Sequence, residues 1–267
     1  MDIPEDNPEE YAKDGKIFCI DGRIGYGSSL SLRQKCTRII YRLIEILLSL
    51  FILVLTFPVM LIVALIIKCD SPGPALFFQY RCSRSKQVKG SILSGKNEFS
   101  SGSKGFDPEK NYWKPMTFKF VKFRTMYVDA KEKFPELYNY QYTPEQISTI
   151  PFKIENDPRV TRAGRWLRKS TLDELPNFWN VLTGDMRLVG PRPELYEMLP
   201  NYRYDQMHKF TVKPGITGLP QINGRGRLSL QDTIAYDLEY VDSKSVRLDI
   251  KILIMTIWRV LTSHGAF

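Results

Sequence analysis

The sequence predicts an α+β protein, mainly helical, that associates with a membrane. A long apolar run, Leu43 to Ile67, has the length needed to span a bilayer as a straight helix. Residues 117–125 alternate between polar and apolar side chains, which is typical of a half-buried strand. Several other segments carry helix-capping residues and helical spacing. With 267 residues, 43% of them hydrophobic, we expect one core domain with appendages.

Charge is distributed unevenly along the chain. The net charge is +9, and the first fourteen residues hold six acids and one lysine, a net of −5, which leaves +14 for the rest. A basic body favours polyanionic partners such as nucleic acid, anionic lipid or phosphorylated substrates. We interpret residues 1–32 as a flexible acidic and polar extension, without a cleavable signal peptide. Nucleic acid is disfavoured because no RNP, KH or helix-turn-helix signature is present.

Cysteine and histidine usage excludes some classes of protein. The four cysteines show neither C-x₂-C spacing nor a disulfide framework, which indicates a reduced, cytosol-facing environment. Only two histidines occur, and no H-E-x-x-H motif is present. The chain therefore offers little material for a histidine-based metalloenzyme.

Residues 33–69 are predicted to be a re-entrant membrane helix preceded by a basic collar. Pro58 lies inside the apolar run and removes one backbone hydrogen bond, so a kink is expected there. Cations lie on both sides of the run, whereas a spanning helix prefers them on one side. A helix that enters the membrane and returns to the same face satisfies both observations better than a spanning helix. Glu45 is costly in such a run, and Arg42 is an available partner. The collar consists of Arg33, Lys35, Arg38 and Arg42.

The region after the apolar run begins with a loop at 70–74 and a short strand at 75–81. We predict an inserted surface loop at 83–116, which is rich in Ser, Lys and Gly. It contains a P-loop-like pattern, but Asn97 replaces the Mg²⁺-binding Ser or Thr and no apolar helix follows, so we reject a nucleotide site there. The strand at 117–125 would place Lys122 and Arg124 on one face.

The stretch from Asp157 to Pro193 carries the strongest chemical signal. Five cations precede the adjacent acids Asp173 and Glu174. Guanidinium groups bind phosphate oxygens as a fork, and a carboxylate can hold Mg²⁺ or attack phosphorus. We expect a helix that begins near Pro176 and has Gly184 as its C-cap, with the two acids at its N-terminus. On spacing alone, a capping box from Thr171 to Glu174 explains the same residues equally well.

The C-terminal part contains two predicted turns and two predicted helices. The turns, at 213–218 and 223–225, would bring backbone amides and Arg225 close to a ligand. Ser229 can cap a helix that extends to about Asp242. The second helix, 248–262, is apolar around most of its circumference. We favour an interfacial position at the membrane surface for it over packing in the core.

Four motifs together resemble the bacterial sugar transferase family, the monotopic phosphoglycosyl transferases. They are LDELPNFWNVLTGDMRLVGPRPE at 172–194, KFRTM at 122–126, KPGITG at 213–218 and QINGR at 221–225. The similarity runs from Arg38 to the C-terminus apart from the insertion. Leu219-Pro220 stands where relatives often carry Trp-Ala, which puts local packing or sugar choice in doubt. The resemblance implies a re-entrant helix broken at proline and a catalytic domain, residues 70–267, at the cytosolic face of the bacterial inner membrane.

The resemblance also implies a reaction. Such enzymes transfer a sugar-1-phosphate from a UDP-sugar to polyprenol phosphate, here undecaprenyl phosphate, and release UMP, as the first step of a membrane-linked glycan pathway. It implies Asp173 as a nucleophile that forms a covalent phosphosugar intermediate, Glu174 as metal ligand or base, and Mg²⁺ held by both acids. The residues it implies in substrate binding are Lys122, Arg124, Arg168, Pro191, Arg192 and Arg225.

Two other functions stay open at this point. One is a membrane glycosyltransferase that passes on only the sugar and releases UDP. The other is a non-catalytic basic scaffold that binds anionic membrane phospholipids. The identity of the sugar, the polyprenol length and the formation of a homodimer are not readable from these residues.

Overall fold

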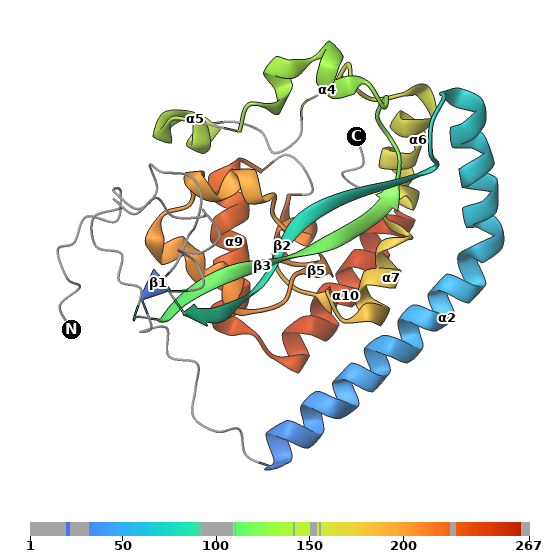
Figure 1. Cartoon of the computed structure of the whole chain (residues 1–267). Helices are drawn as coiled ribbons and strands as arrows, with labels where there is room; N and C mark the ends of the chain where they lie inside the picture. Colours follow the sequence, from blue (N-terminus) through green and yellow to red (C-terminus); the bar gives the residue numbers. More distant parts are fainter. Residues whose placement is uncertain are drawn as a thin grey trace.

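The computed structural model describes residues 20–21, 32–89, 91, 109, 111–140, 142–149, 154, 156–224 and 228–262. Almost all of the predicted N-terminal extension, and Arg225, lie outside this set. The described part is a mainly helical α+β structure, as expected (Figure 1). Its elements are β1 Ile20–Asp21, α2 Leu32–Asp70, β2 Leu76–Lys89, β3 Asn111–Phe123, α4 Ala130–Lys133, η1 Pro135–Tyr138, α5 Pro144–Thr149, α6 Arg162–Ser170, η2 Leu172–Glu174, α7 Asn177–Thr183, β4 Arg187–Val189, η3 Tyr196–Asn201, η4 Tyr204–Thr211, β5 Gly215–Thr217, α8 Leu219–Asn223, α9 Leu230–Ser243 and α10 Val246–Leu261.

Helix α2 is one continuous helix of 39 residues with Pro58 inside it. Figure 1 shows it changing direction as it passes along one side of the domain. The predicted helix-break-helix is therefore a bend within a single helix, since a proline costs one hydrogen bond without ending the helix here. From Cys36 to Asp70 it is long and apolar enough to cross a membrane. Most of its large apolar side chains are exposed, for example Val54 and Leu55.

Both halves of α2 are attached to the same domain. In the N-terminal half, Glu45 and Ser49 are buried, and the helix packs on α7. In the C-terminal half, Val63 and Ile67 form a buried cluster with Phe123 and residues of α6. The domain therefore touches the helix near both of its ends.

The main sheet is a long antiparallel hairpin of β2 and β3, with β1 on the other edge of β3. Its register runs from Leu76 opposite Phe123 to Lys89 opposite Asn111, with an irregularity between Cys82 and Ser85. The prediction of a surface loop at 83–116 is therefore wrong at both ends of that range. Residues 83–89 belong to β2, and residues 111–116 belong to β3. Composition favoured a loop, but cross-strand pairing in a hairpin supplies the backbone hydrogen bonds whatever the composition.

A second, two-stranded parallel sheet joins β4 and β5 in the centre of the domain. Arg187 pairs with Gly215, and Val189 pairs with Thr217. A side chain at Gly190 would lie 2.7 Å from the Lys213 carbonyl oxygen, so the chain following β4 can approach β5 only as glycine. The buried residues around this sheet include Met186, Leu188, Val189, Leu219, Ile222, Tyr240 and Ile252.

Helix α10 has one face in the core and one face exposed. Ile252 is fully buried, whereas Ile254 and Trp258 are more than half exposed. Core packing and an exposed apolar surface thus occur on the same helix. Its interfacial position at a membrane stays a prediction.

Candidate active site

The acid pair lies in a short turn between two helices. Thr171 adopts a left-handed conformation, with φ of 64°, and ends α6. Asp173 and Glu174 follow in the single 3₁₀ turn η2, so the prediction that they occupy the N-terminus of the next α-helix is wrong by one turn. That helix, α7, begins at Asn177 after Pro176. Thr171 makes no capping hydrogen bond to η2 through its side chain, which excludes the capping box.

The end of α7 agrees with the prediction. Gly184 adopts a left-handed conformation, with φ of 85°, and its N–H donates to the Val181 carbonyl oxygen. Glycine accepts this conformation without steric cost, so the helix can end sharply and the chain can turn into β4.

Asp173 is 7% exposed, a degree of burial that a carboxylate tolerates only beside cations or hydrogen-bond donors.

Three of the predicted cations lie around this acid pair. Arg192 Nη1 lies 3.7 Å from Glu174 Oε1. The pKa of Lys122 is lowered to about 8, mainly by burial, with contributions from the charges of Arg168 and Arg192, while the charge of Asp173 opposes the shift. A lysine affected by all these charges is near each of them. The structure therefore brings Lys122, Arg168 and Arg192 together with Asp173 and Glu174.

Arg168 is oriented from behind by residues outside the acid pair. Its Nε donates to Thr125 Oγ1 at 3.1 Å, and its Nη1 lies 3.8 Å from Asp157 Oδ2. Asp157 is itself held by Arg159, whose Nε and Nη2 each donate to it at 2.9 Å. Burial lowers the pKa of Arg168, and the nearby carboxylates Asp157 and Asp173 oppose that shift. These contacts fix the Arg168 guanidinium at the edge of the site. Arg168 keeps its positive charge there.

Arg81 on β2 is a site residue that sequence reasoning missed, because it was counted only among the cations flanking the membrane segment. Its Nη1 donates to the Pro193 carbonyl oxygen at 2.7 Å. Burial lowers the pKa of Arg81 to about 10, with a further contribution from the charge of Arg192. The hairpin register places Phe77 opposite Lys122 and Arg81 opposite Phe118. Because side chains alternate along a strand, Arg81 and Lys122 lie on one face of the hairpin. This alternation is the sequence signal that could have pointed to Arg81.

Arg124 does not join this group. It is 4% exposed, and its guanidinium donates to the carbonyl oxygens of Ser71, Pro72 and Pro74, each at 2.7 Å. These contacts anchor the loop between α2 and β2. They hold the Arg124 guanidinium against that loop, just after β3 ends at Phe123, and so do not support the prediction that Arg124 binds phosphate beside Lys122. Arg225 lies outside the described residues.

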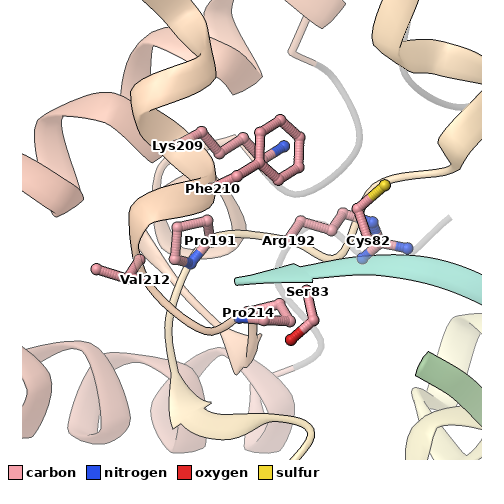
Figure 2. Close-up of a pocket in the computed structure, with 8 residues that line it drawn as sticks. All are labelled: Cys82, Ser83, Pro191, Arg192, Lys209, Phe210, Val212 and Pro214. Atoms are coloured by element: carbon pink, nitrogen blue, oxygen red, sulfur yellow. The ribbon is translucent and has the colours of Figure 1, made fainter. Parts of the chain in front are cut away.

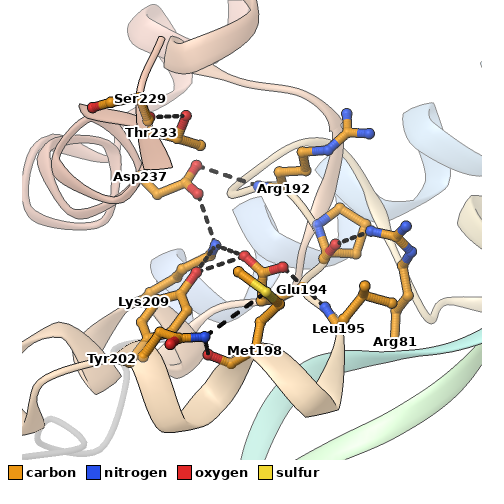
Figure 3. A network of polar contacts seen from close by, with 12 residues as sticks. Arg81, Arg192, Glu194, Leu195, Met198, Tyr202, Lys209, Ser229, Thr233 and Asp237 are labelled. Atoms are coloured by element: carbon orange, nitrogen blue, oxygen red, sulfur yellow. Dashed lines mark hydrogen bonds and ion pairs between the residues drawn. The ribbon is translucent and has the colours of Figure 1, made fainter. Parts of the chain in front are cut away.

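A buried polar network holds the loop that carries Arg192 (Figure 3). Lys209, which is 2% exposed, lies 3.0 Å from Asp237 Oδ2 and donates to Tyr202 Oη at 2.8 Å. Tyr202 in turn donates to Glu194 Oε2 at 2.6 Å. The Arg192 backbone N–H donates to Asp237 Oδ1 at 3.3 Å. The loop 191–194 is therefore fastened on one side by Asp237 and on the other through Glu194.

Charges inside this network are balanced around one lysine. Burial raises the pKa of Asp237, against the charge of Lys209. For Glu194 burial acts in the same direction, but Lys209 and the Tyr202 hydroxyl outweigh it, so that the pKa of Glu194 is lowered. One buried cation thus faces two carboxylates. Removing any one of these three groups would leave a buried charge without its partner and would destabilise the fold.

A small pocket opens beside Arg192 (Figure 2). Pro191, a predicted substrate-binding residue, forms part of its wall. The pocket lies between the loop after β4 and the loop before β5. Its lining residues are Cys82, Ser83, Pro191, Arg192, Lys209, Phe210, Val212 and Pro214.

The donors available for a metal ion are the two adjacent acids. Within the part of the chain that the structure describes, no group of three or more His, Cys, Asp or Glu side chains is arranged to hold a metal. Asp173 and Glu174 supply oxygen ligands, which suit Mg²⁺, an ion that commonly takes its remaining ligands from water and substrate phosphates. This donor set fits a substrate-assisted Mg²⁺ site.

Comparison with known proteins identifies the family. The profile of the family described as bacterial sugar transferase matches residues 36–89 and 100–263. The chain is 36% identical to the UDP-glucose:undecaprenyl-phosphate glucose-1-phosphate transferase of Escherichia coli K12, over 86% of this chain and 42% of that protein. It is 32% identical to the undecaprenyl-phosphate galactose phosphotransferase of Salmonella typhimurium, over 89% of this chain and 44% of that protein.

A third relative shows a shorter but closer similarity. The chain is 43% identical to the UDP-galactose-lipid carrier transferase of Erwinia amylovora, over 56% of this chain and 31% of that protein. The chain thus spans less than half the length of these three relatives. The profile match covers most of the chain and includes η2, the loop after β4 and the β2–β3 hairpin. The chain belongs to the bacterial sugar transferase family.

Proposed function

We propose that the protein transfers a sugar-1-phosphate from a UDP-sugar to a polyprenol phosphate, undecaprenyl phosphate, and releases UMP. The observation that carries this proposal is the acid pair of η2 surrounded by four cations, Lys122, Arg168, Arg192 and Arg81. Two carboxylates against four cations leave an excess of positive charge, which suits a diphosphate. Relatives named for undecaprenyl-phosphate sugar phosphotransfer support the same reaction.

The reaction proceeds in two displacements at one phosphorus. In the first, a carboxylate oxygen of Asp173 bonds to the β-phosphorus of the UDP-sugar, the bond to the bridging oxygen breaks, and UMP leaves. In the second, a phosphate oxygen of polyprenol phosphate bonds to the same phosphorus, and the Asp173 carboxylate leaves. The product is a polyprenyl-diphosphate-sugar. A carboxylate nucleophile replaces one difficult displacement between two anions with two easier ones.

The surrounding side chains divide the remaining tasks. Arg192, Arg168 and Lys122 bind phosphate oxygens and hold the diphosphate in line with Asp173. Glu174 acts as a metal ligand with Asp173 or as the base for the acceptor. When bound, Mg²⁺ supplies charge neutralisation for the approach of two anions. Arg225 remains a proposed phosphate ligand on the basis of its motif alone.

The geometry of α2 supports a monotopic arrangement. The hydrocarbon core of a bilayer is about 30 Å thick, and a spanning helix places its two ends on opposite sides. Here Glu45 near one end and Ile67 near the other are both buried against one domain. A domain on one side of the membrane can hold both ends only if the helix bends back or lies in the interface. We propose the cytosolic face of the bacterial inner membrane for this domain, because UDP-sugars and the lipid acceptor meet there.

Released nucleotide tests the proposal. Protein in detergent is incubated with Mg²⁺, undecaprenyl phosphate and a panel of UDP-sugars, beside an Asp173→Asn variant. UMP that is released by the wild type and lost in the variant is the expected result, and the active donor identifies the sugar. UDP in place of UMP would show a glycosyltransferase that passes on only the sugar. Lipid binding without any nucleotide would show a basic membrane scaffold.

A further inference from the structure

Glu45 is a buried carboxylate in the most apolar helix of the protein. It is 1% exposed. Its Oε1 accepts hydrogen bonds from Arg187 Nε at 2.9 Å and from the Leu188 backbone N–H at 3.1 Å. The expected partner Arg42 forms a longer ion pair, with Nη1 3.7 Å from Glu45 Oε2, and its Nη2 donates to the Leu182 carbonyl oxygen. The main partners of Glu45 therefore belong to strand β4.

Docking of a helix on a domain does not need a buried charge. Apolar side chains pack at lower cost, because a carboxylate must be desolvated before it is paired. A carboxylate that accepts one side-chain and one backbone hydrogen bond instead fixes direction and register. Arg187 is further restrained, since its guanidinium lies 4.7 Å from the centre of the Tyr41 ring on the preceding turn of α2. Glu45 thus holds β4 at a defined position on the helix.

The position of β4 is passed on to the loop that carries Arg192. The Gly190 N–H donates to the Thr217 carbonyl oxygen at 2.9 Å, and the Gly215 N–H donates to the Pro191 carbonyl oxygen at 2.9 Å. The glycines leave no room for a side chain between these segments, so they move together. Arg192 follows Val189, the last residue of β4, by three positions and reaches Glu174.

We propose that Glu45 is a positioning residue that couples the seating of α2 to phosphate binding by Arg192. The proposal rests on the proposed function for the phosphate-binding role of Arg192. A shift of β4 relative to α2 would move the guanidinium away from η2. The other end of the helix has a comparable contact, because the Ala163 N–H of α6 donates to Asp70 Oδ2 at 3.1 Å. Since α6 carries Arg168, α2 is linked to both arginines indirectly, to Arg192 through β4 and to Arg168 through α6.

Binding of UDP to the full chain in nanodiscs, with Mg²⁺ present, tests this role. Glu45→Ala is expected to weaken UDP binding about tenfold through misplacement of Arg192. Glu45→Gln is expected to restore most of it, since an amide oxygen accepts the same two N–H donors. Tyr41→Phe is the matched control. It loses the hydrogen bond from Tyr41 to Asp249 at 2.7 Å but keeps the ring beside Arg187, and is expected to bind UDP as the wild type does.

A double mutant separates positioning from general docking. In an Arg192→Ala background, Glu45→Ala should cause no further loss of affinity, because its effect passes through Arg192. Fully additive losses, equal binding by Glu45→Ala and wild type, or a Tyr41→Phe loss as large as that of Glu45→Ala would each overturn the proposal. UMP release by the same wild-type preparation tests the reaction separately. UDP binding without UMP release removes the proposed reaction and leaves this inference standing, while a wild type that binds no UDP overturns both.

Discussion

Arg192 Nη1 lies 3.7 Å from Glu174 Oε1, although the two residues come from the loop after β4 and from turn η2. This contact links the acid pair to the loop that we propose binds phosphate. It is longer than a charged hydrogen bond, which measures about 2.7–2.9 Å. A phosphate oxygen of the substrate can therefore compete with Glu174 for the guanidinium.

Asp173→Asn is expected to abolish turnover, with a loss of more than about 10⁴-fold in kcat, because an amide cannot form the covalent intermediate. The fold should be retained, since the amide has nearly the same shape. UMP release and thermal unfolding measure the two effects in parallel. Activity retained above that level would remove Asp173 as the nucleophile.

Arg192→Ala is expected to raise KM for the UDP-sugar about 10- to 100-fold, the range for losing a hydrogen bond to a charged group. Its backbone contact to Asp237 does not depend on the side chain, so the loop should keep its position. Arg203→Ala is the matched control. Arg203 is an exposed arginine paired with Asp205 at 2.8 Å, away from the acid pair, and its loss should leave KM unchanged.

Substrate affinity is expected to fall as pH rises through about 8. The pKa of Lys122 is lowered to about 8 from 10.5, so the free enzyme carries this charge below pH 8 and loses it above. An anionic ligand favours the protonated form, and binding above pH 8 should therefore take up a proton. Lys122→Arg remains charged throughout and should flatten the KM–pH profile. A fall of equal size in that variant would assign the titration to another group.

Mg²⁺ is expected to bind weakly to the free protein and more tightly in the presence of UDP. Asp173 and Glu174 supply only part of a coordination shell, and a diphosphate adds further oxygen ligands. Calorimetric titration of Mg²⁺ with and without UDP measures the difference, and a chelator should stop UMP release. Tight Mg²⁺ binding without nucleotide would indicate protein ligands beyond these two acids.

Lys209→Met is expected to destabilise the fold by about 3–5 kcal/mol, because Glu194 and Asp237 would be left buried without their cation. Chemical denaturation in detergent measures the change. Lys133→Met provides the matched control, since Lys133 forms an exposed ion pair with Asp129 in α4. Equal midpoints of unfolding for Lys209→Met and wild type would show that the network contributes nothing to stability.

The sequence predicted the local turns of the candidate site better than the long-range contacts that hold them. Short, local signals identified the acid pair, Gly184 as a C-cap and the loop of Pro191 and Arg192, because each depends on neighbouring residues. Arg124 was misassigned since its partners, the carbonyl oxygens of residues 71–74, are about fifty positions away in sequence. Distance along the chain hides such contacts.

The partners of buried charges were equally hidden. The expected ion pair of Glu45 with Arg42, one turn away on the helix, is present, but the closest donors to Glu45, Arg187 and Leu188 on β4, were not predicted. The hairpin that replaces part of the predicted loop depends on pairing between β2 and β3, which composition does not report. In each case the tertiary structure decides between local alternatives that the sequence leaves equal.

The attachment of α2 near both of its ends also affects how the proposed enzyme would meet a lipid acceptor. In the proposed arrangement the domain cannot tilt freely or lift from the lipid surface, because each end of the helix restrains it. The acid pair then travels at a constant height above the lipid headgroups. The search for a polyprenol phosphate becomes lateral diffusion in a plane, and the frequency of encounters depends on the surface density of the lipid rather than on its bulk concentration.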